Sequence, residues 1–331
     1  MRTLVTGGAG FIGCNYVRHL LAREPEAQVR VLDKLTYAGN LENLRDVLDG
    51  GRVEFVQGDI CDPQAVADAM RDVQIVVHFA AETHVDRSIH SAEAAVKTNV
   101  EGTFRLLEAA RETDLQRFIH VATDEVYGAS TGQHFGEEDA LNPRNPYSAT
   151  KAGGDRLAYS YFVTYGVPVI ITRPTNTYGP YQYPEKLIPR FVYRALRDEP
   201  LPVYGSGRQQ RDWLHVQDHC RAVETLLSLG QVGEAYNIVG GNERVNMEVV
   251  RLILDELGKP ESLIKHVEDR PGHDIRYALK DEKLKALGWK SEVDWETGLR
   301  ETIRWFAGHR EWLESSIARG RDFMEKWYQN R

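Results

Sequence analysis

Cysteine is scarce in this sequence of 331 residues, and its scarcity narrows the class of protein. The three cysteines, Cys14, Cys61 and Cys220, are too few and too far apart for a disulfide scaffold, so they predict a reducing, cytoplasmic compartment. Because no Cys-x-x-Cys pair indicates zinc, we predict no bound metal.

Long apolar runs and basic blocks are also missing. No stretch approaches the ~18 apolar residues that a membrane span needs. Residues 1–7 lead directly into a strand and a glycine turn, without the hydrophobic region of a signal peptide. The formal net charge is -8 and no cluster of Lys and Arg stands out, so we predict neither a membrane nor a nucleic acid as partner.

The first half of the chain alternates short apolar runs with longer amphipathic stretches. This alternation predicts an α/β fold of the Rossmann type, a doubly wound parallel sheet with helices on both faces. Such sheets bind ligands at the carboxyl ends of their strands. The predicted strands are residues 4–6, 29–33, 53–56, 75–79, 118–122 and 167–172.

Proline and glycine become frequent after about residue 175, and basic residues recur in the loops there. We therefore predict two parts without a visible linker. Residues 1–174 form a cofactor-binding domain that also carries the catalytic residues, and residues 175–331 form a smaller, mixed substrate-binding lobe.

Three glycines, Gly7, Gly10 and Gly13, follow the first predicted strand and open a helix. This spacing is typical of a turn on which a dinucleotide pyrophosphate rests against the helix N-terminus. Asp33 lies 20 residues past Gly13, at the end of the second strand, where a carboxylate accepts ribose hydroxyls. Because that carboxylate repels a 2′-phosphate, the pattern favours NAD over NADP, although the neighbouring Lys34 could tolerate phosphate.

Two further strand ends are candidate cofactor contacts. Asp59 and Ile60 could bracket the adenine, and Phe79 precedes Ala80 and Ala81, whose small side chains would let a cofactor pass close to the backbone. Tight helix packing explains the two alanines equally well.

Tyr147 and Lys151 lie about one helical turn apart and therefore share a face. We expect the Lys151 ammonium to lie near the phenol and lower the Tyr147 pKa, as a general base for a hydroxyl proton requires. Upstream, Thr123 precedes the carboxyl pair Asp124 and Glu125. Neighbouring residues of a regular strand point to opposite faces, so the chain must leave the strand around Asp124 for both to serve one site.

With the glycine turn and Asp33, the Tyr147 and Lys151 pair resembles the extended short-chain dehydrogenase/reductase superfamily. Residues 123–128, Thr-Asp-Glu-Val-Tyr-Gly, closely resemble the signature of nucleoside-diphosphate-glucose 4,6-dehydratases, the dTDP-glucose enzymes in particular. Residues 83–88, 178–189, 211–216 and 269–274 look like segments of the same family, so the resemblance covers nearly the whole chain.

This resemblance implies a lyase that converts dTDP-glucose to dTDP-4-keto-6-deoxyglucose and water for deoxysugar biosynthesis, with tightly bound NAD regenerated in each turnover. C4 is oxidised, water is lost across C5 and C6, and the hydride returns to C6. Glu125 would be the base at C5 and Asp124 the acid at C6. Tyr147 would be the base at the C4 hydroxyl, which Thr123 would hydrogen-bond, while Lys151 would hold the nicotinamide ribose.

The resemblance implies further contacts in both parts of the chain. Those to the cofactor fall at Phe11, Ile12, Lys34, Leu35, Thr36, Thr83, Thr98 and Thr177. Those to the substrate fall at Thr83, His84, Asn176, Glu185, Lys186, Leu187, Pro202, Val203, Tyr204, Arg211, Asn246, Arg270, His273 and Tyr277. Among these, Lys186, Arg211, Arg270 and His273 are the candidate cations for the diphosphate, and Tyr204 would stack on the base. Cys14 replaces a commoner Ser and would place a thiol near the pyrophosphate.

Three alternatives stay open. A 4-epimerase or a nucleotide-sugar decarboxylase of the same superfamily would share the Tyr and Lys, but neither requires Asp124 together with Glu125. A non-catalytic NAD-sensing protein would typically have lost the Tyr or the Lys. The family also implies a homodimer that packs residues 96–112 and 148–165 into a four-helix bundle, although either helix could instead pack only on its own sheet. Thymine and uracil differ by one methyl group, so the sequence leaves the nucleotide open.

Overall fold

The computed structural model describes residues 1–269 and 273–328 and confirms the predicted α/β class. Its centre is a seven-stranded sheet in the order β10-β6-β5-β4-β1-β2-β3, in which every neighbouring pair is parallel. The strands of this sheet are β1 (Arg2–Thr6), β2 (Gln28–Asp33), β3 (Val53–Gln57), β4 (Ile75–His78), β5 (Arg117–Val121), β6 (Val169–Pro174) and β10 (Ala235–Ile238).

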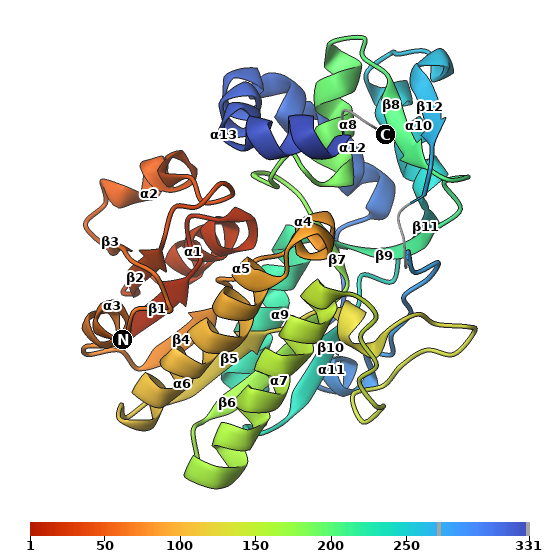
Figure 1. The fold of residues 1–331 in the computed structure, drawn as a ribbon. Helices are drawn as coiled ribbons and strands as arrows, with labels where there is room; N and C mark the ends of the chain where they lie inside the picture. The colour runs from red at the N-terminus through yellow and green to blue at the C-terminus, as the bar shows by residue number, and fades with distance from the viewer. Residues whose placement is uncertain (270–272, 329–331) are drawn as a thin grey trace.

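Helices cover both faces of this sheet (Figure 1). The helices packed on one face are α1 (Phe11–Arg23), α9 (Val216–Leu229) and α11 (Glu282–Ala286). Those on the other face are α3 (Pro63–Ala69), α6 (Thr103–Arg111) and α7 (Pro146–Tyr165). Shorter elements connect them: η1 (Leu41–Leu44), α2 (Arg45–Leu48), α4 (Val85–His90), α5 (Glu93–Val96), the π-helical turn η2 (Lys97–Gly102) and η3 (Asp124–Tyr127).

Each strand serves two hydrophobic cores, because successive side chains of a strand point to opposite faces. Leu4 packs with α3, α6 and α7, whereas its neighbour Val5 packs with α1 and α9. Phe118 and Ile119 divide in the same way. The near-continuous apolar runs in the sequence therefore reflect a sheet that is buried on both sides.

A third core joins most of the later elements, which gather in the upper part of Figure 1. Its helices are α8 (Leu187–Leu196), α10 (Asn246–Glu256), α12 (Trp295–Gly308) and α13 (Arg310–Tyr328). Two small sheets and a turn accompany them: β7 (Asn176–Tyr178), β9 (Gln210–His215) and β11 (Glu243–Val245); β8 (Leu201–Tyr204) and β12 (Ile264–Val267); and η4 (Glu261–Leu263).

The chain crosses between these parts more than once. The helices α9 and α11 and the edge strand β10 follow residue 175 in the sequence, yet they complete the large sheet and cover one of its faces. The domain boundary between residues 174 and 175 therefore remains a prediction, because elements that follow residue 175 belong to both parts of the structure. Across residues 1–269 and 273–328, none of the helices has the length and hydrophobicity of a bilayer span.

Candidate active site

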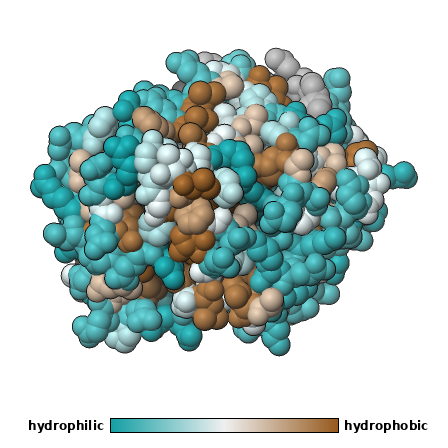
Figure 2. Space-filling view, turned by 90° about the horizontal axis from the view of Figure 1, so that it is seen from below, coloured by the Kyte–Doolittle hydropathy of each residue, from teal (hydrophilic) through white to brown (hydrophobic). Residues whose placement is uncertain are grey.

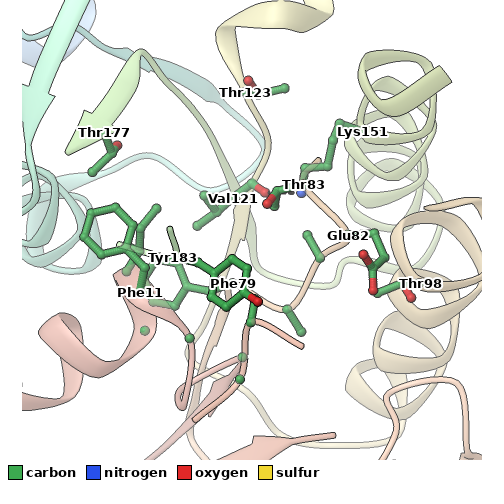
Figure 3. A pocket seen from close by; sticks show the side chains of 18 of the residues that line it. Phe11, Phe79, Glu82, Thr83, Thr98, Val121, Thr123, Lys151, Thr177 and Tyr183 are labelled. Atoms are coloured by element: carbon green, nitrogen blue, oxygen red, sulfur yellow. Dashed lines mark hydrogen bonds between the residues drawn. The ribbon is translucent and has the colours of Figure 1, made fainter. Parts of the chain in front are cut away.

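A cavity of about 290 Å³ opens at the carboxyl ends of the central strands, where the parallel-sheet prediction places ligands. Its walls come from the loop after β1, the ends of β2, β4 and β5, the helix α7 and the segment around β7. Figure 3 shows aromatic and hydroxyl side chains converging on this space from these separate elements. The glycine turn, the carboxyl pair and the Tyr–Lys pair all line it.

The glycines of this turn are required because the turn packs tightly against neighbouring backbone. Gly7 has φ +69, and a Cβ added there would lie 2.7 Å from backbone atoms of Ala80. A Cβ on Gly13 would lie 2.3 Å from the Gly7 carbonyl oxygen. The helix α1 starts after Gly10 without a side-chain cap, so its first N–H groups can bind an anion. These residues fit a dinucleotide pyrophosphate.

Asp33 ends β2 at the rim of the cavity. Its two carboxylate oxygens accept backbone N–H groups of Leu35 (2.8 Å) and Ala9 (3.0 Å), which fix the side chain while lone pairs remain for ribose hydroxyls. Lys34 forms an ion pair with Asp59 at 2.6 Å. The positive charge that could have attracted a 2′-phosphate is therefore engaged by a neighbouring carboxylate.

The predicted departure from the strand at the carboxyl pair is confirmed. The strand β5 ends at Val121, and Asp124 and Glu125 begin the short helix η3, with Thr123 as its N-cap. The Thr123 hydroxyl accepts the Glu125 backbone N–H at 3.3 Å, and Gly128 ends the turn with φ +80. Because η3 replaces the alternation of a strand, both carboxyl groups line one cavity.

Asp124 is fully enclosed, and this enclosure determines its protonation. Burial, and then the charge of Glu125, raises the pKa of Asp124 to about 8. The Thr123 hydroxyl lies 3.1 Å from its Oδ1, whereas its Oδ2 has no hydrogen-bond partner within the described chain. Asp124 is thus a carboxylic acid at neutral pH, with one oxygen free for a ligand.

The predicted effect of Lys151 on Tyr147 is wrong in this arrangement. The Lys151 ammonium donates to the Val121 carbonyl at 2.6 Å, and burial lowers its own pKa to about 8 (Figure 3). Burial, followed by the negative charge of Glu125, raises the pKa of Tyr147 above its usual range. Burial and then the carboxyl pair, neither of which the Tyr–Lys spacing reveals, therefore determine the direction in which the pKa of the phenol shifts.

Most predicted site residues come together in this one cavity. Besides the residues above, the predicted positions that line it are Phe11, Ile12, Thr36, Ile60, Phe79, Ala81, Thr83, Thr98, Asn176, Thr177, Glu185 and Lys186. Leu35, His84 and Leu187 are neighbours of lining residues in the sequence but do not line the cavity themselves. Cys14 is a correction, because its buried thiol donates to the Phe11 carbonyl beneath the turn and does not face the cavity.

The predicted residues after Lys186 that the structure describes lie outside this cavity. Arg211 donates to backbone carbonyls of Gln210, Ile275 and Asp274, and its guanidinium covers the ring of Tyr277 at 4.5 Å. His273 lies 2.6 Å from an Asp269 carboxylate oxygen.

The remaining predicted positions surround α8, α10 and β8. Pro202 and Tyr204 line a second cavity of about 130 Å³, while the side chain of Val203 is buried in the core beside it. Asn246 begins α10, and its Oδ1 is buried without a partner in the described structure. Arg270 lies outside the described residues.

Several lining residues escaped the sequence predictions. Three of them are close to segments that resemble the family: Glu82 precedes residues 83–88, and Gln182 and Tyr183 lie within residues 178–189. That proximity is the sequence signal that could have identified them. Burial raises the pKa of Glu82, and it raises that of the neighbouring Glu185 to about 7. The other missed lining residues are Leu32, Ala38, Gly39, Val121, Ala122, Pro174 and Thr175.

The fold and the site define a dinucleotide-binding enzyme of the extended short-chain dehydrogenase/reductase type. The family model described as GDP-mannose 4,6 dehydratase matches residues 4–302. The chain therefore belongs to this family of nucleotide-sugar dehydratases.

Individual proteins agree with this placement. The chain is 50% identical to the low-salt glycan biosynthesis protein Agl12 of Haloferax volcanii, over 94% of this chain and 100% of the relative. It is 49% identical to a dTDP-glucose 4,6-dehydratase of Streptomyces niveus, over 95% of each chain. The crystal structure of the dTDP-glucose 4,6-dehydratase DesIV from Streptomyces venezuelae, solved with NAD and a second ligand, has a TM-score of 0.93 and 48% identity, covering 96% of this chain and 100% of that one.

Proposed function

We propose that this protein is a dTDP-glucose 4,6-dehydratase that forms dTDP-4-keto-6-deoxyglucose and water. One observation carries the proposal: Asp124 and the adjacent Glu125 share a cavity with Tyr147 and Lys151, and burial raises the pKa of Asp124. Removal of water from a sugar needs an acid and a base at neighbouring carbons, and a hydride transfer needs a base at a hydroxyl. The named dehydratases that resemble this chain at nearly half identity support the same reaction.

The cofactor is NAD. The DesIV structure with NAD bound supports this assignment, as does the engagement of Lys34 by Asp59. When bound, NAD supplies the acceptor and later the donor of the hydride. We infer that Gly7, Gly10 and Gly13 would hold its pyrophosphate and Asp33 a ribose.

The first half-reaction depends on α7. Tyr147 takes the proton of the C4 hydroxyl, which the Thr123 hydroxyl orients, and Lys151 would hold the nicotinamide ribose from the same helix face. The high pKa of Tyr147 beside Glu125 makes a bare phenolate unfavourable, so we infer that its proton moves only as the hydroxyl reacts. The C4 ketone that results makes the C5 proton acidic.

The second half-reaction depends on η3. Glu125 takes the C5 proton while Asp124 gives its own proton to the departing C6 hydroxyl, and the carbon–carbon double bond forms as the C6–O bond breaks. Asp124 suits the acid role because its buried Oδ2 has no partner among the described residues. Asn176, whose Oδ1 is buried and unpartnered in the same described set, suits a contact to the sugar.

The substrate diphosphate requires cations at the mouth of this cavity. Lys186, which lines the cavity and donates to the Thr83 carbonyl at 2.7 Å, would supply one of them. We propose that Arg211, Arg270 and His273 complete the diphosphate site, and that Pro202 and Tyr204 contact the base.

Incubation of the purified protein with dTDP-glucose, followed by alkali, tests the reaction. We expect the ultraviolet absorbance of a 4-keto-6-deoxy sugar without added NADH. A galactose-type product without that absorbance would favour a 4-epimerase and reject the proposal. UDP-glucose, assayed in parallel, measures how strongly the protein prefers the thymine nucleotide.

We also propose a homodimer in the cytoplasm. Large apolar side chains are exposed on the two helical segments predicted to pair: Val96 (50%), Tyr159 (43%), Val163 (62%) and Tyr165 (51%). Figure 2 shows that apolar residues gather in patches within a largely hydrophilic face. Such patches favour association with a second copy. The three buried, free cysteines suit a reducing compartment. Sedimentation at several concentrations tests the dimer, and monomeric behaviour at micromolar concentration would reject it.

A further inference from the structure

Asn145 connects the two groups of catalytic residues. It is the N-cap of α7, one residue before the helix that carries Tyr147 and Lys151. Its Oδ1 accepts the Ser148 backbone N–H at 2.9 Å, and the Ser148 hydroxyl accepts the Asn145 backbone N–H at 3.2 Å. Because a backbone N–H only donates, this capping box requires the amide oxygen to face the helix.

The other end of the same amide therefore faces η3. Its Nδ2 lies 3.2 Å from Oε2 of Glu125 and donates to it. The orientation of the amide is determined by the helix cap, so the donor at Glu125 is a consequence of how α7 begins. The N-cap residue of one helix thus reaches the carboxylate of another element.

Tyr277 is the other hydroxyl near this carboxylate, but its proton is committed elsewhere. The Tyr277 hydroxyl lies 2.8 Å from Oδ2 of Asp274 and 3.4 Å from Oε2 of Glu125. A phenol carries one proton, and the shorter contact takes it. Asp274 also pairs with Arg144 at 3.0 Å. Over residues 1–269 and 273–328, Asn145 is thus the side chain whose N–H group is available to donate a hydrogen bond to the Glu125 carboxylate.

We propose that Asn145 is a positioning residue for the elimination step, holding Glu125 as a carboxylate directed at the C5 proton. A donor to a carboxylate favours its charged form, which is the form that accepts a proton. The inference rests on the proposed dehydratase function and concerns only its second half-reaction.

Two full-length variants separate this role from helix capping. Asn, Asp and Ser cap helices about equally well, so Asn145→Asp and Asn145→Ser keep the start of α7. The Asp variant replaces the donor with a charged oxygen beside Glu125, and the Ser variant removes the donor because its side chain is shorter. Each would be assayed with bound NAD and dTDP-glucose. Single-turnover NADH absorbance reports C4 oxidation, and deuterium uptake at C5 from heavy water reports proton abstraction.

We expect both variants to melt within a few degrees of the wild type and to oxidise C4 within about threefold of its rate. Deuterium uptake should slow on the order of 10- to 100-fold, most in Asn145→Asp. In that variant alone the acidic limb of the pH profile should move to higher pH, because a neighbouring negative charge makes Glu125 hold its proton more tightly.

An unchanged C5 exchange rate and pH limb in Asn145→Asp would overturn the inference. Equal slowing of both steps together with a lowered melting temperature would also overturn it, since that result indicates capping alone. A wild-type protein that forms no 4-keto-6-deoxy sugar would reject the proposed function, and the role of Asn145 with it. If the wild type forms the product and both variants dehydrate dTDP-glucose at the wild-type rate, only the role of Asn145 is rejected.

Discussion

The guanidinium of Arg173 forms a buried ion pair with Asp155, whose carboxylate oxygen lies 2.8 Å from its Nε. Asp155 lies one turn beyond Lys151 on α7, and Nη1 of Arg173 also donates to the Tyr127 hydroxyl oxygen at 2.6 Å. Tyr127 is the last residue of η3. A single cation at the end of β6 therefore joins the helix of the Tyr–Lys pair to the turn of the carboxyl pair.

Arg173→Met should therefore destabilise the fold and disturb both half-reactions. The variant removes the buried partner of Asp155 and leaves its carboxylate only the half-exposed Arg156, which costs up to about 3–5 kcal/mol in the free energy of unfolding. Urea denaturation measures this change. The double variant Arg173→Met with Asp155→Leu removes both charges and should recover part of the loss, whereas a double variant no more stable than Arg173→Met would contradict the ion-pair explanation.

Glu125→Gln should separate the two half-reactions. The amide cannot accept the C5 proton, so elimination should slow by about 10²- to 10⁴-fold while C4 oxidation continues and NADH accumulates. Tyr147→Phe is the matched contrast and should lose C4 oxidation itself. Single-turnover absorbance of NADH distinguishes them. Normal dehydration by Glu125→Gln, or unimpaired NADH formation by Tyr147→Phe, would reject the corresponding role.

The pH dependence of stability reports the state of Asp124. Its folded pKa of about 8 exceeds its usual value of 3.8, so between these values the folded protein binds more protons at this site than the unfolded chain does. The free energy of unfolding therefore falls as pH rises through this window, by up to about 1.4 kcal/mol per pH unit from this group.

Asp124→Asn removes that dependence and should be more stable than the wild type at pH 7, with little advantage near pH 4. Denaturation curves at pH 4, 5.5, 7 and 8 measure the difference between the two proteins, which cancels the other titrating groups. A constant difference across this range would show that Asp124 does not retain its proton in the folded state.

Local rules predicted part of this site. The steric need for Asp124 and Glu125 to leave the strand follows from two adjacent residues alone, and η3 satisfies it. The contact of Lys151 with the Val121 carbonyl depends on how α7 packs against β5, 30 residues earlier in the chain, which no local spacing encodes. The donor from Asn145 to Glu125 likewise depends on the approach of two separate elements.

The C-terminal helix α13 contacts the segment that borders the cofactor cavity. Arg319 donates to the carbonyl of Gly39, a lining residue, at 2.9 Å, and the Trp312 indole donates to Asn43 Oδ1 at 2.7 Å. Asn43 in turn donates to the Ala9 carbonyl in the glycine turn at 2.9 Å. A helix about 280 residues away in sequence thus braces the cavity wall where NAD would lie.

Arg319→Ala should therefore weaken NAD retention without changing the chemical steps. Loss of one hydrogen bond of this kind corresponds to roughly a 2- to 10-fold faster release of NAD. The measurement is NAD that remains with the protein after gel filtration, compared with turnover at saturating added NAD. Ser315→Ala, at an exposed position of the same helix, is the matched control.

If Arg319→Ala retains NAD as the control does, α13 does not brace the cofactor. If turnover stays low at saturating NAD, the substitution has disturbed more than NAD retention. The proposed reaction returns NAD to its starting form in every turnover, so the protein does not need to exchange the cofactor between turnovers. A contact from α13 that slows NAD release is consistent with this reaction.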